Sequence, residues 1–103
     1  MTVTLRITQR FDARHEREFM ELERKFSELE RRRPDYPKGK RMQPISGAEA
    51  CNTLIWECEF PDIGSAYEVL DFFSGDESHE ALLEEQLPYF KDVSISFYRN
   101  LEF

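Results

Sequence analysis

The apolar residues of this chain change their spacing along the sequence, and the order of those changes constrains the fold more than any other feature. Residues 2–10 alternate between apolar and polar side chains, which is typical of a β-strand with one buried face. Asp12 follows as a candidate helix cap, and from there to Arg33 the apolar residues recur every three or four positions. Pro34 then ends the predicted helix, because a proline inside a helix removes a backbone hydrogen bond. The buried stripe of this helix is predicted to consist of Phe19, Leu22, Phe26 and Leu29.

The rest of the chain continues with alternating strand and helix patterns. We expect, in sequence, a weak strand at 40–46, a strong strand at 50–60, a helix after Asp62, a second helical segment at about 77–87 and a strand at 93–101. Pro44 places the weak strand at an edge of the sheet, because proline cannot donate a backbone hydrogen bond to a neighbouring strand. The Ser74-Gly75 pair interrupts the second helix, and Asp76 is the candidate cap of the segment that follows.

This order of elements, β-α-β-β-α-β, is the ferredoxin-like pattern. We therefore predict one α+β domain, residues 1–103, with a four-stranded antiparallel sheet in the strand order 4-1-3-2 and a second helix broken in two. A chain of 103 residues is long enough for one domain and too short for two. Both helices are expected on the apolar face of the sheet, which in the strongest strand consists of Leu54, Trp56, Cys58 and Phe60.

The opposite face of the predicted sheet is the main indication of a homodimer. Two helices cover only one face of such a sheet, and the other face carries Ile55 and Tyr98 among threonine, serine and charged side chains. The sequence also ends in Leu101-Glu102-Phe103, which supplies more apolar residues than the sheet needs. A second copy of the chain would cover both features if the two sheets packed face to face into a barrel.

Two stretches of the sequence resemble a known family. Residues Asn52–Pro61, which read NTLIWECEFP, are similar to the corresponding strand of NIPSNAP-like proteins. Residues Asp76–Leu82 and the later Pro88-Tyr89-Phe90 are similar to the second helix of those proteins, and the resemblance is best between Lys40 and Tyr98. It implies the dimeric α/β-barrel superfamily, which also contains the antibiotic-biosynthesis monooxygenases and several stress-responsive domains. The resemblance implies fold and dimerisation rather than an activity, because this superfamily serves many functions.

The composition argues against nucleic acid and membranes as partners. The formal net charge is -7, whereas proteins that bind phosphate backbones present a basic face. The basic run Arg31-Arg32-Arg33 lies in the last predicted turn of a helix, where it complements the negative end of the helix dipole. No apolar stretch approaches the ~20 residues that a transmembrane helix needs. Because a strand pattern follows Met1 directly, with no signal peptide, we expect a cytoplasmic protein.

The histidine and cysteine positions give no indication of a metal or cofactor site. His15 and His79 are the only histidines, and each is expected in the first turn of a helix without a second ligand nearby. Cys51 and Cys58 fall on opposite faces of one predicted strand, so they cannot form a disulfide with each other. The sequence also lacks a nucleophile triad and a glycine-rich phosphate loop. We therefore predict two reduced thiols and no requirement for metal, flavin or haem.

The mixed face of the sheet carries the candidate ligand-binding residues, which are Arg6, Thr53, Glu57, Ser96 and Tyr98. In the predicted strand order Arg6 lies between the other candidates and points away from the helices. A buried arginine must be paired, so one hypothesis is a structural ion pair with Glu57 that fixes the register of the dimer. The other is a polar-lined cavity in which Arg6 holds a carboxylate or phenolate, Tyr98 orients it and Glu57 acts as a general base.

Two functions fit these observations. The first is a homodimer that binds a small organic molecule in the polar-lined cavity, with cofactor-independent catalysis on an aromatic or carbonyl compound as its enzymatic form. The second is a non-catalytic interaction or stress-response module, a dimer whose lumen is filled by its own side chains. The sequence leaves open which of the two applies, which ligand binds and what type of reaction it would undergo.

Overall fold

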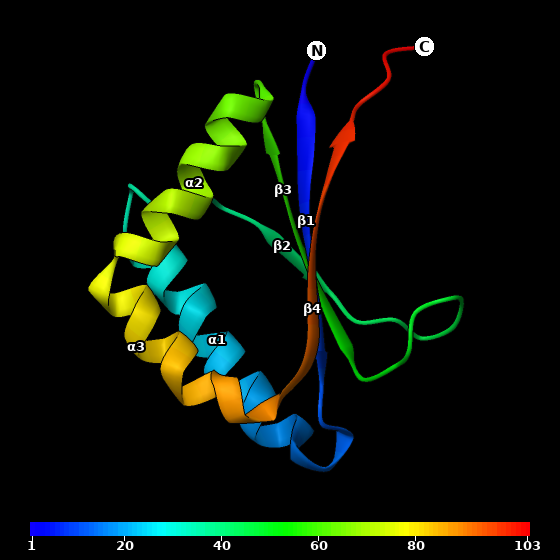
Figure 1. Ribbon diagram of the computed structural model, residues 1–103, viewed down its shortest axis with the longest axis vertical. Helices are drawn as coiled ribbons and strands as arrows, with labels where there is room; N and C mark the ends of the chain where they lie inside the picture. Colours follow the sequence, from blue (N-terminus) through cyan, green and yellow to red (C-terminus); the bar gives the residue numbers. More distant parts are fainter.

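Helices cover one face of a β-sheet and leave the other face open, as Figure 1 shows. The computed structural model describes the whole chain, residues 1–103. Its elements are β1 (Val3–Phe11), the 3-10 turn η1 (Ala13–His15), α1 (Glu16–Arg32), β2 (Lys40–Met42), β3 (Thr53–Phe60), α2 (Ile63–Gly75), α3 (Glu77–Gln86), the 3-10 turn η2 (Leu87–Tyr89) and β4 (Phe90–Arg99). This order confirms the ferredoxin-like α+β fold, with the second helix divided into α2 and α3. None of the helices is long and apolar enough to cross a membrane.

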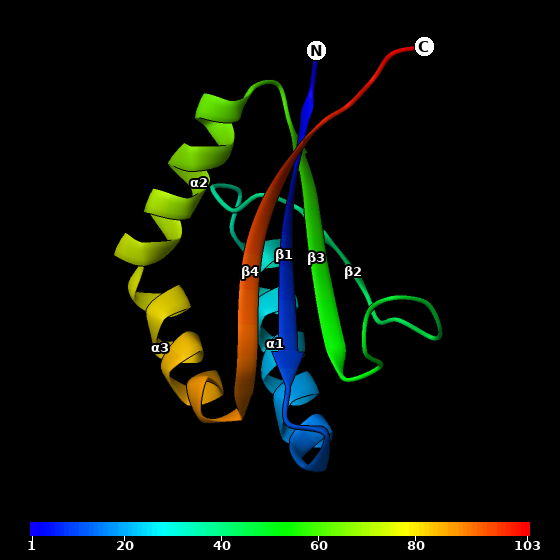
Figure 2. The same cartoon turned by 45° about the vertical axis from the view of Figure 1, so that its right-hand side comes forward.

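The strands form one antiparallel sheet in the order β2-β3-β1-β4, so the predicted order is confirmed. Figure 2 shows β1 in the centre, between β3 and β4. The predicted weak strand is shorter than expected, because β2 ends at Met42. Pro44 cannot donate to a neighbouring strand, and Gly47 adopts a φ of 118°, so the chain leaves the sheet as a loop over 43–52. This loop projects on the open side of the sheet (Figure 1).

Local signals place the helix ends. Asp12, Asp62 and Asp76 each accept a backbone hydrogen bond from the first turn of the segment that they precede, as the cap predictions require. The predicted first helix begins with the short turn η1 before α1, and α1 ends at Arg32, just before Pro34.

The boundaries of the later strands also differ from the predictions. β3 begins at Thr53 rather than at residue 50, and β4 spans 90–99 rather than 93–101. Cys51 therefore lies in the loop and only Cys58 lies in β3, which corrects the prediction that one strand holds both. Both cysteines are free thiols, and burial raises the pKa of Cys58.

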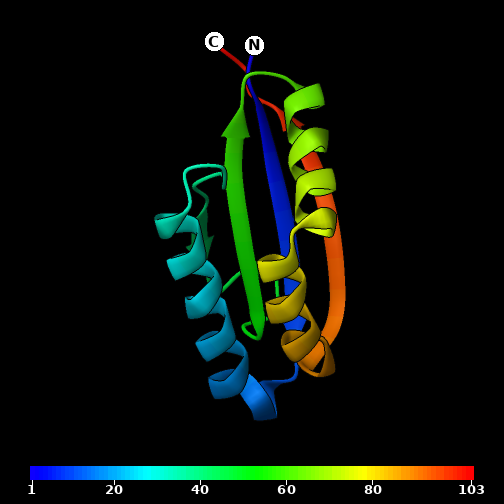
Figure 3. The same cartoon turned by 90° about the vertical axis from the view of Figure 1, so that its left-hand side faces the viewer.

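The hydrophobic core lies between the sheet and the helices. Figure 3 shows α1 over the β2 side of the sheet and the α2–α3 pair over the β4 side. Leu5, Trp56 and Phe60 of the sheet pack against Ala66 of α2, and all of them are buried. A second cluster, Phe11, Phe19 and Leu54, fills the other end of the same layer.

The helix layer does not fully cover the edge strand β4. Val93 and Ile95 lie opposite Gln9 and Ile7, on the helix side of the sheet, yet these two residues are 47% and 49% exposed, because β4 is the outermost strand on its side of the sheet. Leu101 and Phe103 beyond β4 are also exposed in the single chain. The molecule therefore presents apolar surface along one edge.

Candidate functional site

The open face of the sheet brings together four of the five residues predicted from the sequence. Arg6 pairs across the sheet with Glu57 on β3 and with Ser96 on β4. Its Nε and Nη2 atoms donate to Oε1 of Glu57 at 2.9 and 2.7 Å. Its guanidinium carbon lies 4.9 Å from the centre of the Tyr98 ring, so the charge contacts the ring face.

Thr53 does not belong to this group. It pairs with Arg10, four positions along β3 from Glu57, and its side chain is fully buried. A shallow hollow beside residues 48–50 includes Thr53 but not Arg6. The sequence placed Thr53 on the correct face of the sheet but too close to Arg6. Alternation assigns Thr53 and Glu57 to the same face and does not show which of them lies opposite Arg6.

A cavity of about 220 Å³ lies on the other side of the sheet, between the strands and the helices. We call it the helix–sheet cavity. Its apolar lining includes Phe26, Tyr36, Trp56, Leu70, Phe73 and Leu83. Its polar lining includes Gln9, Glu23, Glu30, Arg41, His79 and Gln86. Long polar side chains from both layers therefore converge on a space that the hydrophobic core does not fill.

An ion-pair network forms one wall of this cavity. Glu23 and Glu30 of α1 are only 6% and 7% exposed, although both are carboxylates. Arg41 on β2 donates to Glu23 at 2.6 Å and to both oxygens of Glu30 at 2.9 and 3.0 Å. The indole nitrogen of Trp56 donates to the same Glu30 at 3.0 Å. Two buried carboxylates thus share one arginine, which ties α1 to the sheet.

Two glutamines add unsatisfied polar atoms to the cavity. Gln86 is fully buried, and its Nε2 donates to Glu23 Oε1 at 3.0 Å and contacts the Phe19 carbonyl at 3.4 Å. Its Oε1 has no hydrogen-bond partner, and neither has Oε1 of Gln9. A buried carbonyl oxygen without a partner is uncommon in folded proteins and is typical of positions that receive a water or a ligand.

His79 supplies the one group in the cavity that can exchange a proton near neutral pH. Its ring stacks on Phe73 at a centroid distance of 4.5 Å and lies 5.1 Å from the ring of Phe26. Burial lowers the pKa of His79 below its usual value, so the imidazole is neutral at pH 7. Nδ1 lies 3.4 Å from Glu80 Oε1, which favours the proton on Nδ1 and leaves Nε2 as an acceptor.

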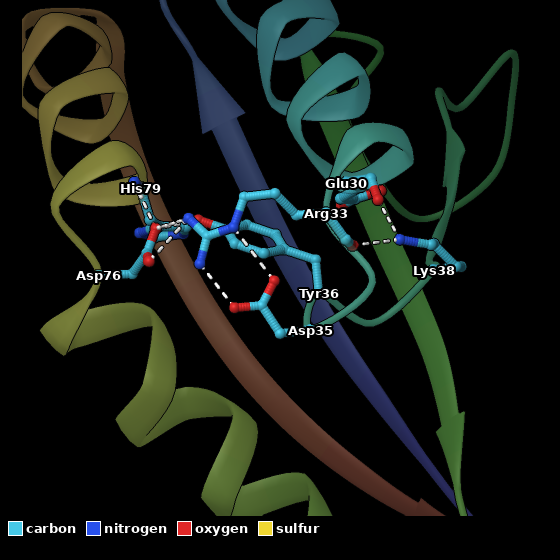
Figure 4. Close-up of polar contacts among 7 residues, drawn as sticks. All are labelled: Glu30, Arg33, Asp35, Tyr36, Lys38, Asp76 and His79. Carbon is cyan, nitrogen blue, oxygen red and sulfur yellow. Dashed lines mark hydrogen bonds and ion pairs between the residues drawn. The ribbon is translucent and has the colours of Figure 1, made fainter.

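A second set of polar contacts fixes the joint between α2 and α3 beside the cavity, as Figure 4 shows. Asp76 accepts hydrogen bonds from the Tyr36 hydroxyl and from the backbone of His79, and it forms an ion pair with Arg33 at 2.9 Å. The Tyr36 hydrogen bond, with these other donors, holds the pKa of Asp76 below its usual value. Asp35 binds the other side of the Arg33 guanidinium. This cluster locks the end of α1 to the start of α3.

Lys38 satisfies the end of α1 in the same region. Its Nζ donates to the carbonyl oxygen of Glu30 in the last turn of α1 and to that of Arg33, which also accepts from the Tyr36 amide. Figure 4 shows this contact next to the joint described above. The segment between α1 and β2 is therefore held against the helix, which fixes where Tyr36 and Arg41 enter the cavity.

Sequence reasoning missed the helix–sheet cavity, although the sequence held part of the signal. Glu23 and Glu30 are seven residues apart, and each directly follows a residue of the predicted apolar stripe of the helix. A seven-residue spacing keeps two side chains on nearly the same side of a helix. Two carboxylates beside an apolar stripe indicate buried polar residues, but nothing in the sequence identifies Arg41 as their partner.

Comparisons with known proteins bear on the fold. No protein-family model matches the chain, and no curated protein matches it. An uncharacterised NIPSNAP domain protein from Burkholderia xenovorans has a similar structure, with a TM-score of 0.79 and 18% identity over 100% of this chain and 97% of its own. A putative antibiotic biosynthesis monooxygenase from Nitrosomonas europaea is similar at a TM-score of 0.70 and 11% identity, over 97% of this chain and 90% of its own.

A third similar structure is a dimeric protein of unknown function and ferredoxin-like fold from Bacteroides fragilis. Its TM-score is 0.70 and its identity 12%, over 96% of both chains. Together these structures confirm that the chain has the fold of NIPSNAP and antibiotic-biosynthesis-monooxygenase-like proteins, as the sequence resemblance implied. Identities this low concern the fold and not the activity.

Proposed function

We propose that this protein binds a small organic molecule in the helix–sheet cavity and acts as a homodimer. The observation that carries the proposal is the unpaired Oε1 of Gln86, a fully buried carbonyl oxygen of a residue that lines a cavity with aromatic walls. The site lies on the opposite side of the sheet from the one expected from the sequence. The open-face residues Arg6, Glu57 and Tyr98 already contact one another, whereas the cavity holds polar atoms with no partner.

A buried polar atom without a partner destabilises a folded protein by about 1–3 kcal/mol. A ligand that donates to Gln86 Oε1 would remove this penalty and bury its own apolar surface against Trp56 and Phe73. The volume of about 220 Å³ exceeds the roughly 150 Å³ of an engineered cavity that binds benzene. It is smaller than the ~300–1,000 Å³ of pockets for larger ligands. A compound with one substituted ring therefore fits best.

Cofactor-independent catalysis is the enzymatic form of this proposal. The lowered pKa keeps His79 neutral at pH 7, so that Nε2 is available to accept a proton from a bound molecule. This residue takes the general-base role that the sequence suggested for Glu57. Glu57 instead accepts two hydrogen bonds from Arg6 on the far side of the sheet.

The homodimer is the second part of the proposal, with the open face of the sheet as its interface. Half-exposed Tyr98 on this face and the exposed tail residue Phe103 contribute apolar surface to it. A second chain that packed on this face would bury the Arg6–Glu57 pair. Light scattering at tens of micromolar is expected to give the mass of a dimer, and deleting residues 100–103 is expected to weaken it. A monomeric wild-type protein would contradict the barrel arrangement.

The filled open face also supports a second candidate function, a non-catalytic interaction or stress-response module. Arg6 is satisfied by Glu57 and Tyr98, so the lumen of the dimer would contain the protein's own side chains rather than a ligand. This candidate predicts that no small molecule binds. Under either function we place the protein in the cytoplasm, whose reducing conditions suit two free thiols.

The test of ligand binding is native mass spectrometry of freshly purified protein, followed by titration with single-ring compounds. Trp56 is the only tryptophan and lines the cavity, so its fluorescence reports binding directly. Leu83→Phe fills the cavity and should abolish binding. Leu87→Phe is the matched control, because Leu87 is exposed and lies outside the cavity lining. Equal binding by both variants would place the ligand elsewhere, and binding by neither the wild type nor Leu87→Phe would support the interaction module.

A further inference from the structure

We infer that the ligand of the helix–sheet cavity is a small cation, namely a protonated amine attached to an apolar or aromatic group. This inference rests on the proposed function and adds the chemical class of the ligand. Two independent observations carry it. The charges around the cavity are unbalanced toward negative, and the polar atoms that lack partners are hydrogen-bond acceptors.

The charge imbalance is located in the wall between α1 and β2. The carboxylates of Glu23 and Glu30 share a single cationic partner, the guanidinium of Arg41. All three side chains are at least four-fifths buried. Glu80 adds a third carboxylate to the lining, although its side chain is half exposed, while His79 is neutral. Buried charges in proteins are normally paired, so this lining has room for a cation and none for an anion.

Apart from the amide of Gln9, the side-chain donors of the cavity are already engaged within the protein. Trp56 Nε1 donates to Glu30, and Arg41 donates to both carboxylates of α1. The hydroxyl of Tyr36 donates to Asp76, and the hydroxyl of Ser74 to a backbone carbonyl. An anionic ligand such as a carboxylate would therefore find one neutral donor, Gln9 Nε2, and would have to displace one of these bonds to gain a second.

The acceptors, in contrast, are free. The orientation of the Gln86 amide is fixed, because its Nε2 faces two acceptors, Glu23 Oε1 and the carbonyl oxygen of Phe19. Its Oε1 therefore points its lone pairs at no donor in the protein. Nε2 of His79 is a second acceptor, since Nδ1 faces Glu80. An ammonium group supplies up to three donors and a positive charge, and so satisfies both the free acceptors and the charge imbalance.

The aromatic walls of the cavity favour a ligand that also carries an apolar or aromatic group. Phe26, Trp56 and Phe73 line the cavity together with Leu70 and Leu83. Aromatic faces attract cations as well as apolar groups, and the attraction is stronger where water is excluded. The sequence pointed to a carboxylate or phenolate held by Arg6, whereas the cavity selects the opposite charge.

Three probes of nearly the same shape test this inference: benzylamine, benzyl alcohol and benzoate. At pH 7 they are a cation, a neutral molecule and an anion, because an alkylamine titrates near the pKa of lysine. Titrations followed by Trp56 fluorescence and by calorimetry should show benzylamine binding about tenfold or more tightly than benzyl alcohol, and no binding of benzoate. Benzoate or benzyl alcohol binding as tightly as benzylamine would overturn the inference and leave the proposed function intact.

A carboxylate variant separates charge selection from simple fit. Glu23→Gln should weaken benzylamine binding about tenfold and change benzyl alcohol binding little. Glu21→Gln is the matched control, since Glu21 lies on the exposed side of the same helix and loses the same charge. If Glu23→Gln does not fold, Gln86→Met tests the free acceptor instead, and the comparison of probes on the wild type needs no variant. Failure of every single-ring compound to bind would refute the proposed function itself, and this inference with it.

Discussion

Replacing Arg41 with methionine removes the only cationic partner of two buried carboxylates. Arg41 makes three hydrogen bonds of 2.6 to 3.0 Å to Glu23 and Glu30, and its own side chain is 19% exposed. Methionine keeps most of the buried volume, so the change isolates the loss of charge and hydrogen bonds. Removing one partner of a buried ion pair costs about 3–5 kcal/mol, because the remaining charge stays desolvated. This loss is a large part of the ~5–15 kcal/mol that stabilises a typical domain.

Urea denaturation followed by Trp56 fluorescence measures the effect. The indole donates to Glu30 in the folded protein, so its emission should change when the network comes apart. With a urea dependence of about 1–3 kcal/mol per molar, the midpoint should fall by roughly 2 M. The expected change is large enough to be read without extrapolation to zero urea.

A second substitution and a matched control complete the experiment. Adding Glu30→Gln to the Arg41→Met variant removes one of the unpaired charges and should restore part of the lost stability. Arg24→Met is the control, because Arg24 pairs with Glu21 on the surface and such pairs contribute about 0–1 kcal/mol. If Arg41→Met costs no more than the control, the carboxylates are solvated and the buried network does not exist as described.

Three further predictions concern other parts of the molecule. Gly39→Ala places a methyl group where the Trp56 indole lies, so the urea midpoint should fall by an amount equivalent to about 1–3 kcal/mol. An unchanged midpoint would show that the backbone around Gly39 moves to make room for the methyl group. Asp76→Ala should cost about 1 kcal/mol in thermal melts, while Asp76→Asn keeps the helix cap. Because the folded pKa of Asp76 is lowered, the stabilisation by its carboxylate should be complete above about pH 4 and should vanish as the pH falls through the folded pKa. A cost of Asp76→Ala that persists in acid would contradict this role. If the chain forms the proposed homodimer, Arg6→Ala should cost about 3–5 kcal/mol, and added Glu57→Gln should recover much of it. A cost below about 1 kcal/mol would show that the pair stays in water.

The fold could be predicted because its signals are local. Strand alternation, the helical stripe, the three aspartate caps and the break at Ser74-Gly75 each depend on a few neighbouring residues. The contact between Arg6, Glu57 and Tyr98 could also be predicted, because alternation sets the face of each strand and the fold pattern sets the strand order. Thr53 marks the limit of this reasoning, since it shares the face of Glu57 and differs from it only in register.

The cavity could not be predicted for a different reason. Its position depends on how closely α1 and α3 approach the sheet, which is a property of packing across the whole domain. Arg41 belongs to a strand of three residues with almost no pattern of its own, so the sequence does not show where its side chain points. Gln86 belongs to α3, a helix whose faces differ little in polarity. The sequence pattern therefore does not distinguish this buried glutamine from the exposed polar residues of the same helix.

The central position of β1 has a consequence for how the chain folds. Val3 pairs with Phe60 on one side and with Arg99 on the other, so β1 finds its partners only after long stretches of chain have closed into loops. The entropy of closing such loops must be overcome before the pairing contributes, which makes folding slower than in a helical bundle of this length. We expect α1 to form early from local contacts and β4 to pair with β1 after β3 does, because the β1–β4 separation along the chain is the longer one. A chain interrupted before β4 would leave β1 as an unpaired edge, the form in which sheets recruit strands from other molecules.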